Sequence, residues 1–584
     1  MDATAAMGVA PICRHGEATG QQCEVDSSWI FAGCASETMM GAMTAAFAPP
    51  GPGQWALDRS HFAGGTTPIC QWLMEESMAR GMRRVFAEIG VPADTLQARF
   101  VNGFMYTRLR PLLRPDHAAT KLPPEPILRV VTHLHPAFRR RAKAAATALR
   151  IRPWVDVAHR WATQLRPAVI AGNRRLQATN PEVLDDAPLG RHVAELLEYC
   201  RDKAELHFWL HGHDLGPIAR YLHAVQGWGI PPADALPALA GASPSTSDPV
   251  RVLVRLRTQL AEAGAAPTTL DDVRAVSPEA AATLDHYLTD RGHLLVTGYD
   301  IVGLTLGEVP GAVLASIVDA VEPPPIDDRA VAGALRSRVR EEHRAEFDLV
   351  LGDARAVMDM RDDNGPSTYE WPVGLLRRAL LAVGRRLVSR GRIANAELAL
   401  ELTPAEAATV LDRDMPSGAE LTRRGHERRA LAQLTPPETL GPVEPAPPLD
   451  VLPTPLDETV AMVRTALSLM GMAGATRPER LMGAGIGTSA YRGRARIAAS
   501  SEDAIENMEP GDVLVVRVTS PAFNAVLSIA GAVVTTEGGP LSHAAVLARE
   551  LGIPAVVGAA GALDLADGAT VEVDPRVGSV RVVT

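Results

Sequence analysis

The stretch that decides the fold of the C-terminal part reads Thr535-Thr-Glu-Gly-Gly-Pro-Leu-Ser-His-Ala-Ala-Val-Leu-Ala-Arg-Glu-Leu-Gly-Ile-Pro-Ala-Val-Val-Gly558. It begins at the end of a β-branched run, 532–535, which predicts a short buried strand. Gly538 and Gly539 follow, and because they carry no Cβ, a ligand can approach the backbone closely there. The stretch therefore predicts a strand that leads into a glycine-rich loop.

A helix and a second strand complete this unit. Ser542 is suited to start the helix, Gly552 is suited to stop it, and the run 553–557 returns as a strand. Four small or apolar residues recur at helical spacing between these ends: Ala544, Leu547, Ala548 and Leu551. For the whole C-terminal α/β domain we expect strands near 513–516, 532–535, 555–557, 570–573 and 579–583, and helices near 521–530 and 541–551.

His543 lies in the first turn of the predicted helix. Free backbone N–H groups and the helix dipole favour an anion there, and a neutral imidazole is a nucleophile near neutral pH. His543 is therefore suited to carry a phosphoryl group. The alternative is a histidine that only packs or caps. A metal site at His543 is a further alternative, but the histidine has no potential ligands nearby in the sequence. No cysteine follows Cys200, and the nearest other histidine is His426.

The same residues resemble the phosphohistidine swivelling domain of phosphoenolpyruvate-utilising enzymes, a family that includes phosphoenolpyruvate synthase, pyruvate phosphate dikinase and rifampin phosphotransferase. The resemblance covers about residues 485–584 and includes flanking segments such as Val518-Thr-Ser-Pro-Ala-Phe523. It implies that His543 is transiently phosphorylated. It also implies that four neighbours support the phosphoryl group: Thr536, Gly538, Gly539 and Ser542. Pro540-Leu541 departs from the family pattern, so one hydroxyl common in relatives is absent.

Length, charge and cysteine usage limit the class of protein. With 584 residues the chain can hold three or four domains, and its net charge of −10 argues against nucleic acid or an anionic membrane as the main partner. The sequence shows neither an apolar run long enough to span a membrane nor a signal peptide. Its five cysteines, odd in number and irregularly spaced, are typical of reduced thiols. We expect a cytoplasmic protein.

The chain before residue 480 is mostly helical, with few evident strands and a loop or linker at 241–249. Helical patterns cover 136–150, 155–178, 190–227, 250–264, 276–290, 327–361, 372–391 and 404–432. Residues 436–455 contain eight prolines, which favour a semi-rigid polyproline spacer, and a helix is expected over 457–480. We divide the chain into a helical substrate-binding region (1–245), its second helical part (246–435), a linker with a connecting helix (436–480) and the swivelling domain (481–584).

A phosphate donor site is not evident in this sequence. No Gly-Lys dipeptide occurs, which excludes a Walker-type phosphate loop, and we find nothing that resembles a nucleotide-grasp domain. A phosphoenolpyruvate-binding barrel, which would follow the swivelling domain in relatives, is not expected after Thr584. We expect ATP and Mg²⁺ to be bound by a separate ATP-grasp subunit.

Short N-terminal segments resemble the substrate-binding subunit of phenylphosphate synthase and, more loosely, the substrate domain of rifampin phosphotransferase. They include Gln54-Trp-Ala-Leu-Asp-Arg-Ser-His-Phe62, Val101-Asn-Gly-Phe-Met-Tyr106 and Leu206-His-Phe-Trp209. The resemblance implies a helical region that presents an organic hydroxyl to the phosphohistidine. In such phenylphosphate synthase systems the ATP-binding part is a separate polypeptide.

Transfer to a hydroxyl needs a base and a cation for the developing charge. Candidates for the base are His61 with Asp58, and His207 with the nearby His211 and His213, while Arg361 is a candidate cation. Each of these residues has the alternative of a packing or surface role. A zinc site from the three clustered histidines is a weaker alternative, because no glutamate lies between His207 and His211. No metal site is predicted.

Together these patterns predict a multidomain phosphotransferase subunit of the dikinase type. A partner would phosphorylate His543, and the phosphoryl group would pass to a small organic acceptor, an alcohol, phenol or enol, in the helical region. Two alternatives stay open: a regulatory or scaffold protein that carries phosphohistidine without small-molecule turnover, and an antibiotic-inactivating phosphotransferase.

Overall fold

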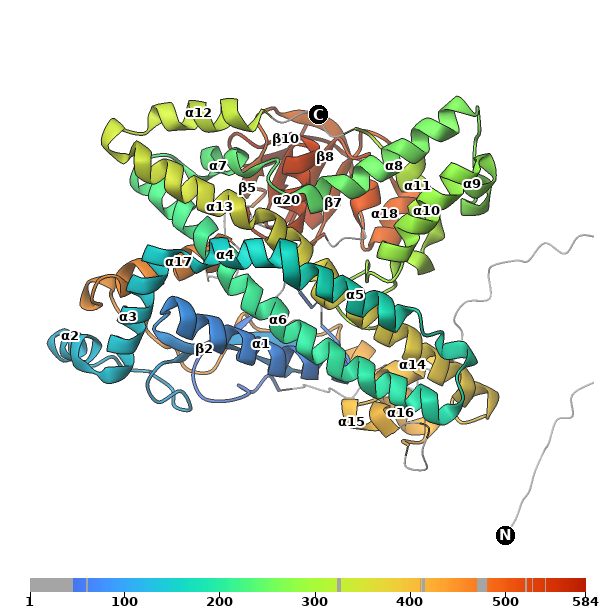
Figure 1. Ribbon diagram of the computed structural model, residues 1–584, viewed down its shortest axis with the longest axis horizontal. Helices are drawn as coiled ribbons and strands as arrows, with labels where there is room; N and C mark the ends of the chain where they lie inside the picture. Colours follow the sequence, from blue (N-terminus) through green and yellow to red (C-terminus); the bar gives the residue numbers. More distant parts are fainter. Residues whose placement is uncertain are drawn as a thin grey trace, which may run out of the picture. The chain divides into compact units, whose positions relative to one another are not determined.

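The computed structural model describes residues 46–584 except 59, 60, 63, 323–326, 410, 412–414, 470–479, 520–522, 528, 541 and 584. Helices dominate up to residue 469, and an α/β domain follows (Figure 1). The multidomain fold expected from the sequence, mostly helical and then α/β, is confirmed. The end of the helix predicted over 457–480 and parts of the helix predicted over 521–530 lie outside the described residues.

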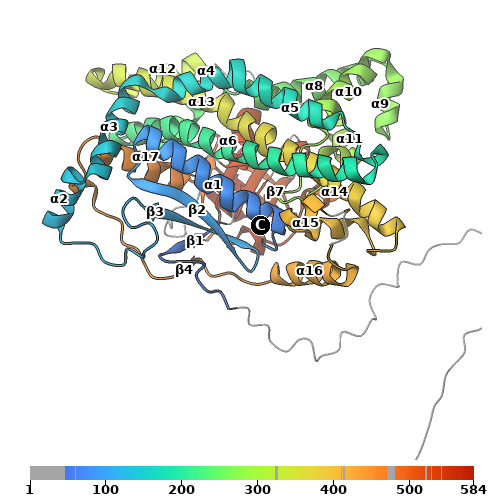
Figure 2. The same ribbon diagram turned by 60° about the horizontal axis from the view of Figure 1, so that its bottom comes forward.

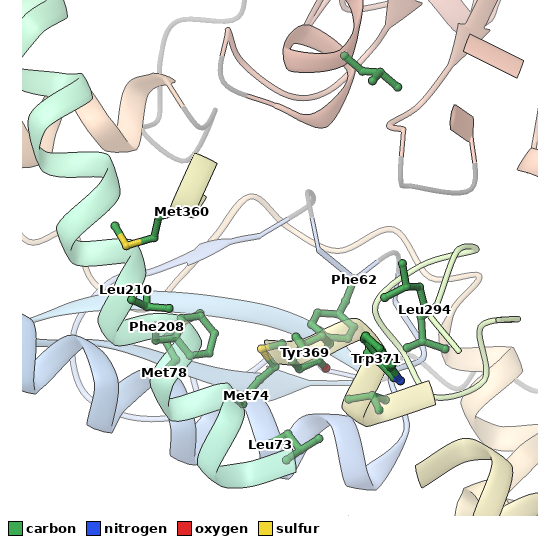
Figure 3. Packing of buried hydrophobic residues seen from close by; sticks show 14 of the residues in the cluster. Phe62, Leu73, Met74, Met78, Phe208, Leu210, Leu294, Met360, Tyr369 and Trp371 are labelled. Carbon is green, nitrogen blue, oxygen red and sulfur yellow. The ribbon is translucent and has the colours of Figure 1, made fainter. Parts of the chain in front are cut away.

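Three long helices form the centre of the helical region. α6 (Asp186–Gly227) packs against α1 (Pro68–Ile89) and α13 (Arg344–Gly365), and the three share one hydrophobic core (Figures 1 and 2). Figure 3 shows Met74, Met78, Phe208 and Tyr369 gathered in this core. The helices around them are α2 (Glu125–Leu134), α3 (Pro136–Ile151), α4 (Pro153–Arg160), α5 (Arg166–Gln177), α7 (Pro232–Ala235), α8 (Pro244–Glu262), α9 (Leu270–Val276), α10 (Pro278–Arg291), α11 (Pro310–Val318), α12 (Asp328–Arg338), α14 (Trp371–Ser389), α15 (Pro404–Thr409), α16 (Gly418–Leu431) and α17 (Leu456–Leu469).

The helical region also contains a four-stranded antiparallel sheet that the sequence pattern did not reveal. Its order is β2 (Ala93–Val101), β3 (Phe104–Pro111), β1 (Trp55–Leu57) and β4 (Thr439–Leu440), and α1 packs on β2 (Figure 2). Asn102 and Gly103 connect β2 to β3 with φ of 53° and 76°. An Asn-Gly pair is a strong signal for such a hairpin turn, because both residues tolerate positive φ. This hairpin shows that the expectation of few strands before residue 480 missed a local signal.

The proline-rich segment is attached to this sheet. Part of it forms β4, and Glu444 accepts hydrogen bonds from the backbone N–H of Gln54 and from the guanidinium of Arg108. Beyond it, α17 packs on α6, where Glu458 pairs with Arg220 at 3.0 Å. β4 and α17 are therefore both held to the helical region.

The prediction of a loop over 241–249 is partly wrong, because α8 already begins at Pro244. Proline is tolerated in a first helical turn, where its missing N–H has no partner in the helix. Backbone N–H of Ser245 donates to Asp359 of α13, which holds the start of α8 against that helix. None of the helices in the described ranges is long and apolar enough to cross a membrane.

The C-terminal domain is built on a seven-stranded sheet. The order is β11 (Ser579–Val582), β10 (Thr570–Asp574), β6 (Tyr491–Ile497), β7 (Val513–Val516), β8 (Ala532–Thr535), β9 (Ala555–Val557) and β5 (Ala484–Ile486). Strands β6 to β9 run parallel, and the outer ones pair antiparallel. β7, β8 and β9 are buried along their whole length, as expected of parallel strands covered on both faces. The five predicted strands agree with the observed ones within one residue.

Three helices belong to this domain: α18 (Ser501–Asn507), α19 (Asn524–Leu527) and α20 (His543–Leu551), which contacts β8 and β9 (Figure 1). α20 is buried on more sides than a surface helix, because it also contacts α8 of the helical region. α20 therefore contacts both its own sheet and the helical region.

Candidate functional site

His543 is the first residue of α20, as its sequence position predicts. Ser542 is the N-cap, and its hydroxyl accepts a hydrogen bond from the backbone N–H of Ala545 at 3.4 Å. Gly538 precedes the cap with φ of 98°, and a Cβ there would lie 2.9 Å from the Ser542 Cβ. Glycine is needed at this position both for the positive φ and for the close approach to the cap.

Thr519 holds the imidazole ring of His543. Its Oγ1 lies 3.0 Å from His543 Nδ1. When Nδ1 carries the proton and donates to this hydroxyl, Nε2 keeps its lone pair. Burial lowers the pKa of His543 to about 4, while the charges of Asp362 and Arg361 act on it in opposite directions. At neutral pH the ring is therefore uncharged, which is the nucleophilic form.

A cavity of about 650 Å³ joins His543 to the helical region. It is lined by His61, His207 and Arg361, three of the four acceptor-side candidates, together with Ser542 and Gly538 of the α20 loop. Much of the remaining wall is apolar and comes from the side chains of α1 and α6, including Met74, Met78, Met82 and Phe208. His61 and His543, which are 482 positions apart in the chain, thus face one space.

Asp58 lies directly behind His61. Its carboxylate, whose side chain is fully buried, lies 2.9 Å from His61 Nδ1. A carboxylate only accepts, so Nδ1 carries the proton and Nε2 keeps its lone pair. Burial opposes the charged form of His61, but the charge and the hydrogen bond of Asp58 outweigh it, so the pKa of His61 is raised. This is the arrangement of an imidazole base held by a carboxylate.

His207 has a different environment. Its ring lies 4.3 Å from that of His211, measured between centroids, and its Nδ1 is 3.3 Å from the Thr368 hydroxyl. Burial, together with the charges of His211 and His61, moves the pKa of His207 well below its usual value. Burial also lowers the pKa of His211 to about 3. Both rings are neutral walls of the cavity at neutral pH and are weaker bases than His61.

Arg361 is a cation that lines the same cavity. It lies on α13 with 13% of its side chain exposed, and its Nη1 donates to Asp362 Oδ1 at 2.7 Å. Its charge lowers the pKa of both His211 and His543, and all three residues line the cavity. A guanidinium that lines the cavity beside the Asp362 carboxylate can stabilise the oxygens of a phosphoryl group.

Comparison with known proteins identifies the domain that carries His543. A family model described as "PEP-utilising enzyme, mobile domain" matches residues 508–578, which include β7, β8, α20 and β9. Residues 508–578 form a PEP-utilising enzyme mobile domain. The phosphohistidine swivelling domain expected from the sequence is thereby confirmed, and phosphotransferases occur among its relatives.

Three relatives match this chain over very different lengths. Chondramide synthase cmdD of Chondromyces crocatus is 27% identical over 568 residues, 90% of this chain and 14% of that protein. A phosphoenolpyruvate synthase of Aeropyrum pernix is 49% identical over 89 residues, 15% of this chain and 11% of that protein. The uncharacterized phosphotransferase YvkC of Bacillus subtilis is 47% identical over 76 residues, 13% of this chain and 9% of that protein. The chain therefore spans less than a sixth of the length of each of these three relatives.

Of the four sequence-predicted supports, Gly538 and Ser542 line the cavity, whereas Thr536 and Gly539 are not among its lining residues. The Thr536 hydroxyl donates to the backbone carbonyl of Arg517 at 3.4 Å, and Gly539 accepts the backbone N–H of Ser542 at 2.8 Å. Thr519 contacts the ring instead. It lies within the segment 518–523 that resembles the family, so this resemblance could have pointed to it.

The histidines of α6 do not converge on one point. His213 lies against Trp209 and bonds Glu88 with its Nε2 at 3.1 Å, whereas His207 and His211 face the cavity shared with the mobile domain. In the part of the chain that the structure describes, no group of three or more His, Cys, Asp or Glu side chains is arranged to hold a metal ion.

Proposed function

We propose that this protein is a phosphotransferase that accepts a phosphoryl group on His543 Nε2 and passes it to the hydroxyl of an organic molecule in the cavity. The observation that carries the proposal is the shared space: His543 of the mobile domain and His61, backed by Asp58, line one cavity. A nucleophile that can be phosphorylated and a base for an acceptor hydroxyl therefore face the same molecule.

The acceptor step follows from this geometry. The acceptor oxygen attacks phosphorus, an O–P bond forms, and the N–P bond to His543 Nε2 breaks. The hydroxyl proton passes to His61 Nε2, whose raised pKa makes it a better base than His207. His543 returns to the neutral ring, and Thr519 holds its Nδ1. Arg361 would offset the charge on the phosphoryl oxygens.

The apolar wall has a role in this reaction. Phosphohistidine is hydrolysed by water, so a cavity that excludes water favours transfer to the acceptor. The side chains of Met74, Met78 and Phe208 favour an apolar acceptor body, such as that of a phenol, an enol or a larger alcohol. We place this reaction in the cytoplasm, consistent with the two described cysteines, Cys70 and Cys200, being free thiols.

We further propose that a separate ATP-grasp subunit supplies the phosphoryl group from ATP and Mg²⁺. The support is the resemblance to phenylphosphate synthase, together with the absence of a Gly-Lys phosphate loop from this sequence. In the donor step a P–O bond of the donor breaks and the N–P bond to His543 forms.

A second candidate, phosphorylation of an antibiotic, is favoured by one observation. The cavity volume of about 650 Å³ exceeds what a single phenol ring needs and lies within the range of sites for drug-sized molecules. The regulatory alternative needs no such cavity beside His543, and we regard it as less well supported.

Labelling of His543 tests the proposal. The purified chain is incubated with ATP labelled at its β- or γ-phosphate, with and without a candidate ATP-grasp subunit, and with labelled phosphoenolpyruvate as an alternative donor. We expect acid-labile, alkali-stable label on the wild type and on His426→Ala, whose histidine is exposed on α16. His543→Ala should carry no label, and label on it equal to that of the wild type would refute the assignment.

A further inference from the structure

Glu370 is a buried acid in the cavity that the proposed transfer does not use. It is the last residue of a π-helical turn, Pro366–Glu370, that joins α13 to α14. Such turns inside helices re-aim side chains and often occur at functional sites. Glu370 is only 2% exposed, and it lines the same cavity as His61 and His543.

The carboxyl group of Glu370 lacks a partner within the described residues. Its Oε2 is buried and makes no hydrogen bond there. Arg291 of α10 also lines the cavity, and its charge acts on Glu370, but the two form no ion pair within 4.0 Å. Burial raises the pKa of Glu370 to about 8. An unpaired buried carboxyl group at neutral pH is therefore an acid that still holds its proton, and it can donate a hydrogen bond.

Two tyrosines of the cavity wall link Glu370 to His61. Tyr369 directly precedes Glu370 in the chain, and the ring of Tyr299 lies 5.6 Å from that of His61 between centroids. Tyr299 also lies 6.3 Å from Tyr369. A molecule that presents its hydroxyl to His61 would therefore pass the two tyrosine rings within reach of Glu370.

We propose that Glu370 recognises the acceptor by donating a hydrogen bond to a neutral oxygen, such as that of a ketone, ester or ether. The acceptor is then a largely apolar, ring-containing hydroxy compound with a second, uncharged polar group. This inference rests on the proposed function, because it assigns the substrate class of the same cavity. Leaving a buried donor unpaired is costly, so the site discriminates against compounds that lack the oxygen.

A matched pair of probes tests this recognition. 4-Hydroxybenzophenone and 4-benzylphenol have the same two rings and the same hydroxyl, and they differ at the bridging carbon, which carries a carbonyl only in the first. Binding of each is measured by titration calorimetry at pH 7 on full-length His543→Ala, so that no transfer occurs. We expect 4-hydroxybenzophenone to bind at least about tenfold tighter than 4-benzylphenol.

Two variants assign the preference to Glu370. Glu370→Gln keeps a donor of the same shape and should keep the preference, whereas Glu370→Leu should abolish it and leave the affinity for 4-benzylphenol within about twofold. The glutamine variant also controls for misfolding. Three outcomes would each overturn the proposal. They are equal affinity of the two probes for His543→Ala with Glu370 intact, no binding of either probe, and a preference that survives in Glu370→Leu.

These binding measurements are independent of phosphotransfer. If His543 is labelled by ATP but the carbonyl preference is missing, the proposed function stands and the recognition by Glu370 fails. If the preference depends on Glu370 but His543 is never labelled, the cavity binds such compounds and the phosphotransferase assignment fails.

Discussion

His61 depends on Asp58 for its basicity. Burial alone would lower the pKa of a histidine, and the buried carboxylate reverses this effect by its charge and its hydrogen bond. Among the residues that the structure describes, no carboxylate bonds the ring of His543, which stays neutral down to a pH of about 4. The two rings therefore suit different steps of the proposed reaction, in which His543 bonds phosphorus and His61 takes a proton.

Replacement of Asp58 by Asn separates these roles. As a base, His61 must be neutral, so the rate of acceptor transfer falls as the pH drops below its raised pKa. In Asp58→Asn the charge is lost and burial lowers this pKa, so the acid limb of the pH–rate profile moves to lower pH. The plateau rate should fall by about 10²-fold, the scale of general base catalysis. Single-turnover transfer from phosphorylated protein at pH 4–9 measures both effects.

The matched control for this variant is the donor step. Labelling of His543 should be unchanged in Asp58→Asn, because Asp58 does not contact that ring. An acid limb that stays in place, or a donor step slowed as much as the acceptor step, would contradict the assignment of His61 as the base.

At the scale of the element, the start of α20 combines two functions. Ser542 caps the helix and thereby fixes the first turn, from which His543 projects into the cavity. Free N–H groups in that turn can bond a phosphoryl oxygen, and the helix dipole stabilises its charge. α18 has the same type of cap, since the Ser500 hydroxyl accepts the backbone N–H of Asp503 at 3.2 Å, but its cap residue does not line the cavity.

A pair of cap variants distinguishes stability from function in this domain. Loss of a serine cap costs about 1 kcal/mol, so Ser542→Ala and Ser500→Ala should lower the thermal unfolding midpoint similarly. Only Ser542→Ala should also slow labelling of His543 by several-fold, because the first turn of α20 then frays around the histidine. Calorimetry and a labelling time course measure the two quantities. Equal labelling rates in the two variants would show that the cap has no role beyond stability.

At the scale of the whole molecule, the proposed function requires the mobile domain to leave the cavity to meet a donor. Arg549 and Glu550 of α20 are both only 5% exposed, with Arg549 Nε 3.5 Å from Glu550 Oε1. Within the described part of the chain, the Arg549 guanidinium makes no hydrogen bond. The other Glu550 oxygen accepts the backbone N–H of Gly241 in the helical region at 3.2 Å. A buried pair with such incomplete bonding limits how firmly the domain docks.

A double-mutant cycle tests this limit. Arg549→Met leaves Glu550 buried without its counter-charge and should weaken docking by up to about 3–5 kcal/mol. Arg549→Met with Glu550→Gln removes both charges and should restore docking to the wild-type level or above it. Hydrogen exchange of the α8 and α20 backbones measures docking, and the rate of acceptor transfer should follow it. If the α8 and α20 backbones exchange as fast in the double variant as in Arg549→Met, the charge pair does not determine how firmly the domain docks.

Some site residues could be predicted because their signal is local. The glycine loop, the serine cap and the 3.6-residue period around His543 lie within about twenty positions, and the resemblance identified the domain. The hairpin at Asn102-Gly103 had an equally local signal that was overlooked. Thr519 lies in the segment 518–523 that resembles the family, but its contact with the His543 ring is visible only in the structure. Glu370 has no such local signal, and it stands out only because it is buried with an Oε2 that makes no hydrogen bond within the described residues.

The sequence by itself determined the C-terminal α/β domain and the place of His543 at a helix start, because strand, turn and helix preferences act between near neighbours. Only the tertiary structure brought His61, Arg361, Glu370 and His543 to one cavity, since their proximity depends on how α6, α13 and α20 pack across hundreds of residues. The tertiary structure also sets the histidine pKa values. The Asp58 carboxylate raises the pKa of His61 despite its burial, whereas burial and the charges of His211 and His61 lower the pKa of His207. Such differences depend on solvent exclusion and distance, neither of which is encoded in the spacing of residue types.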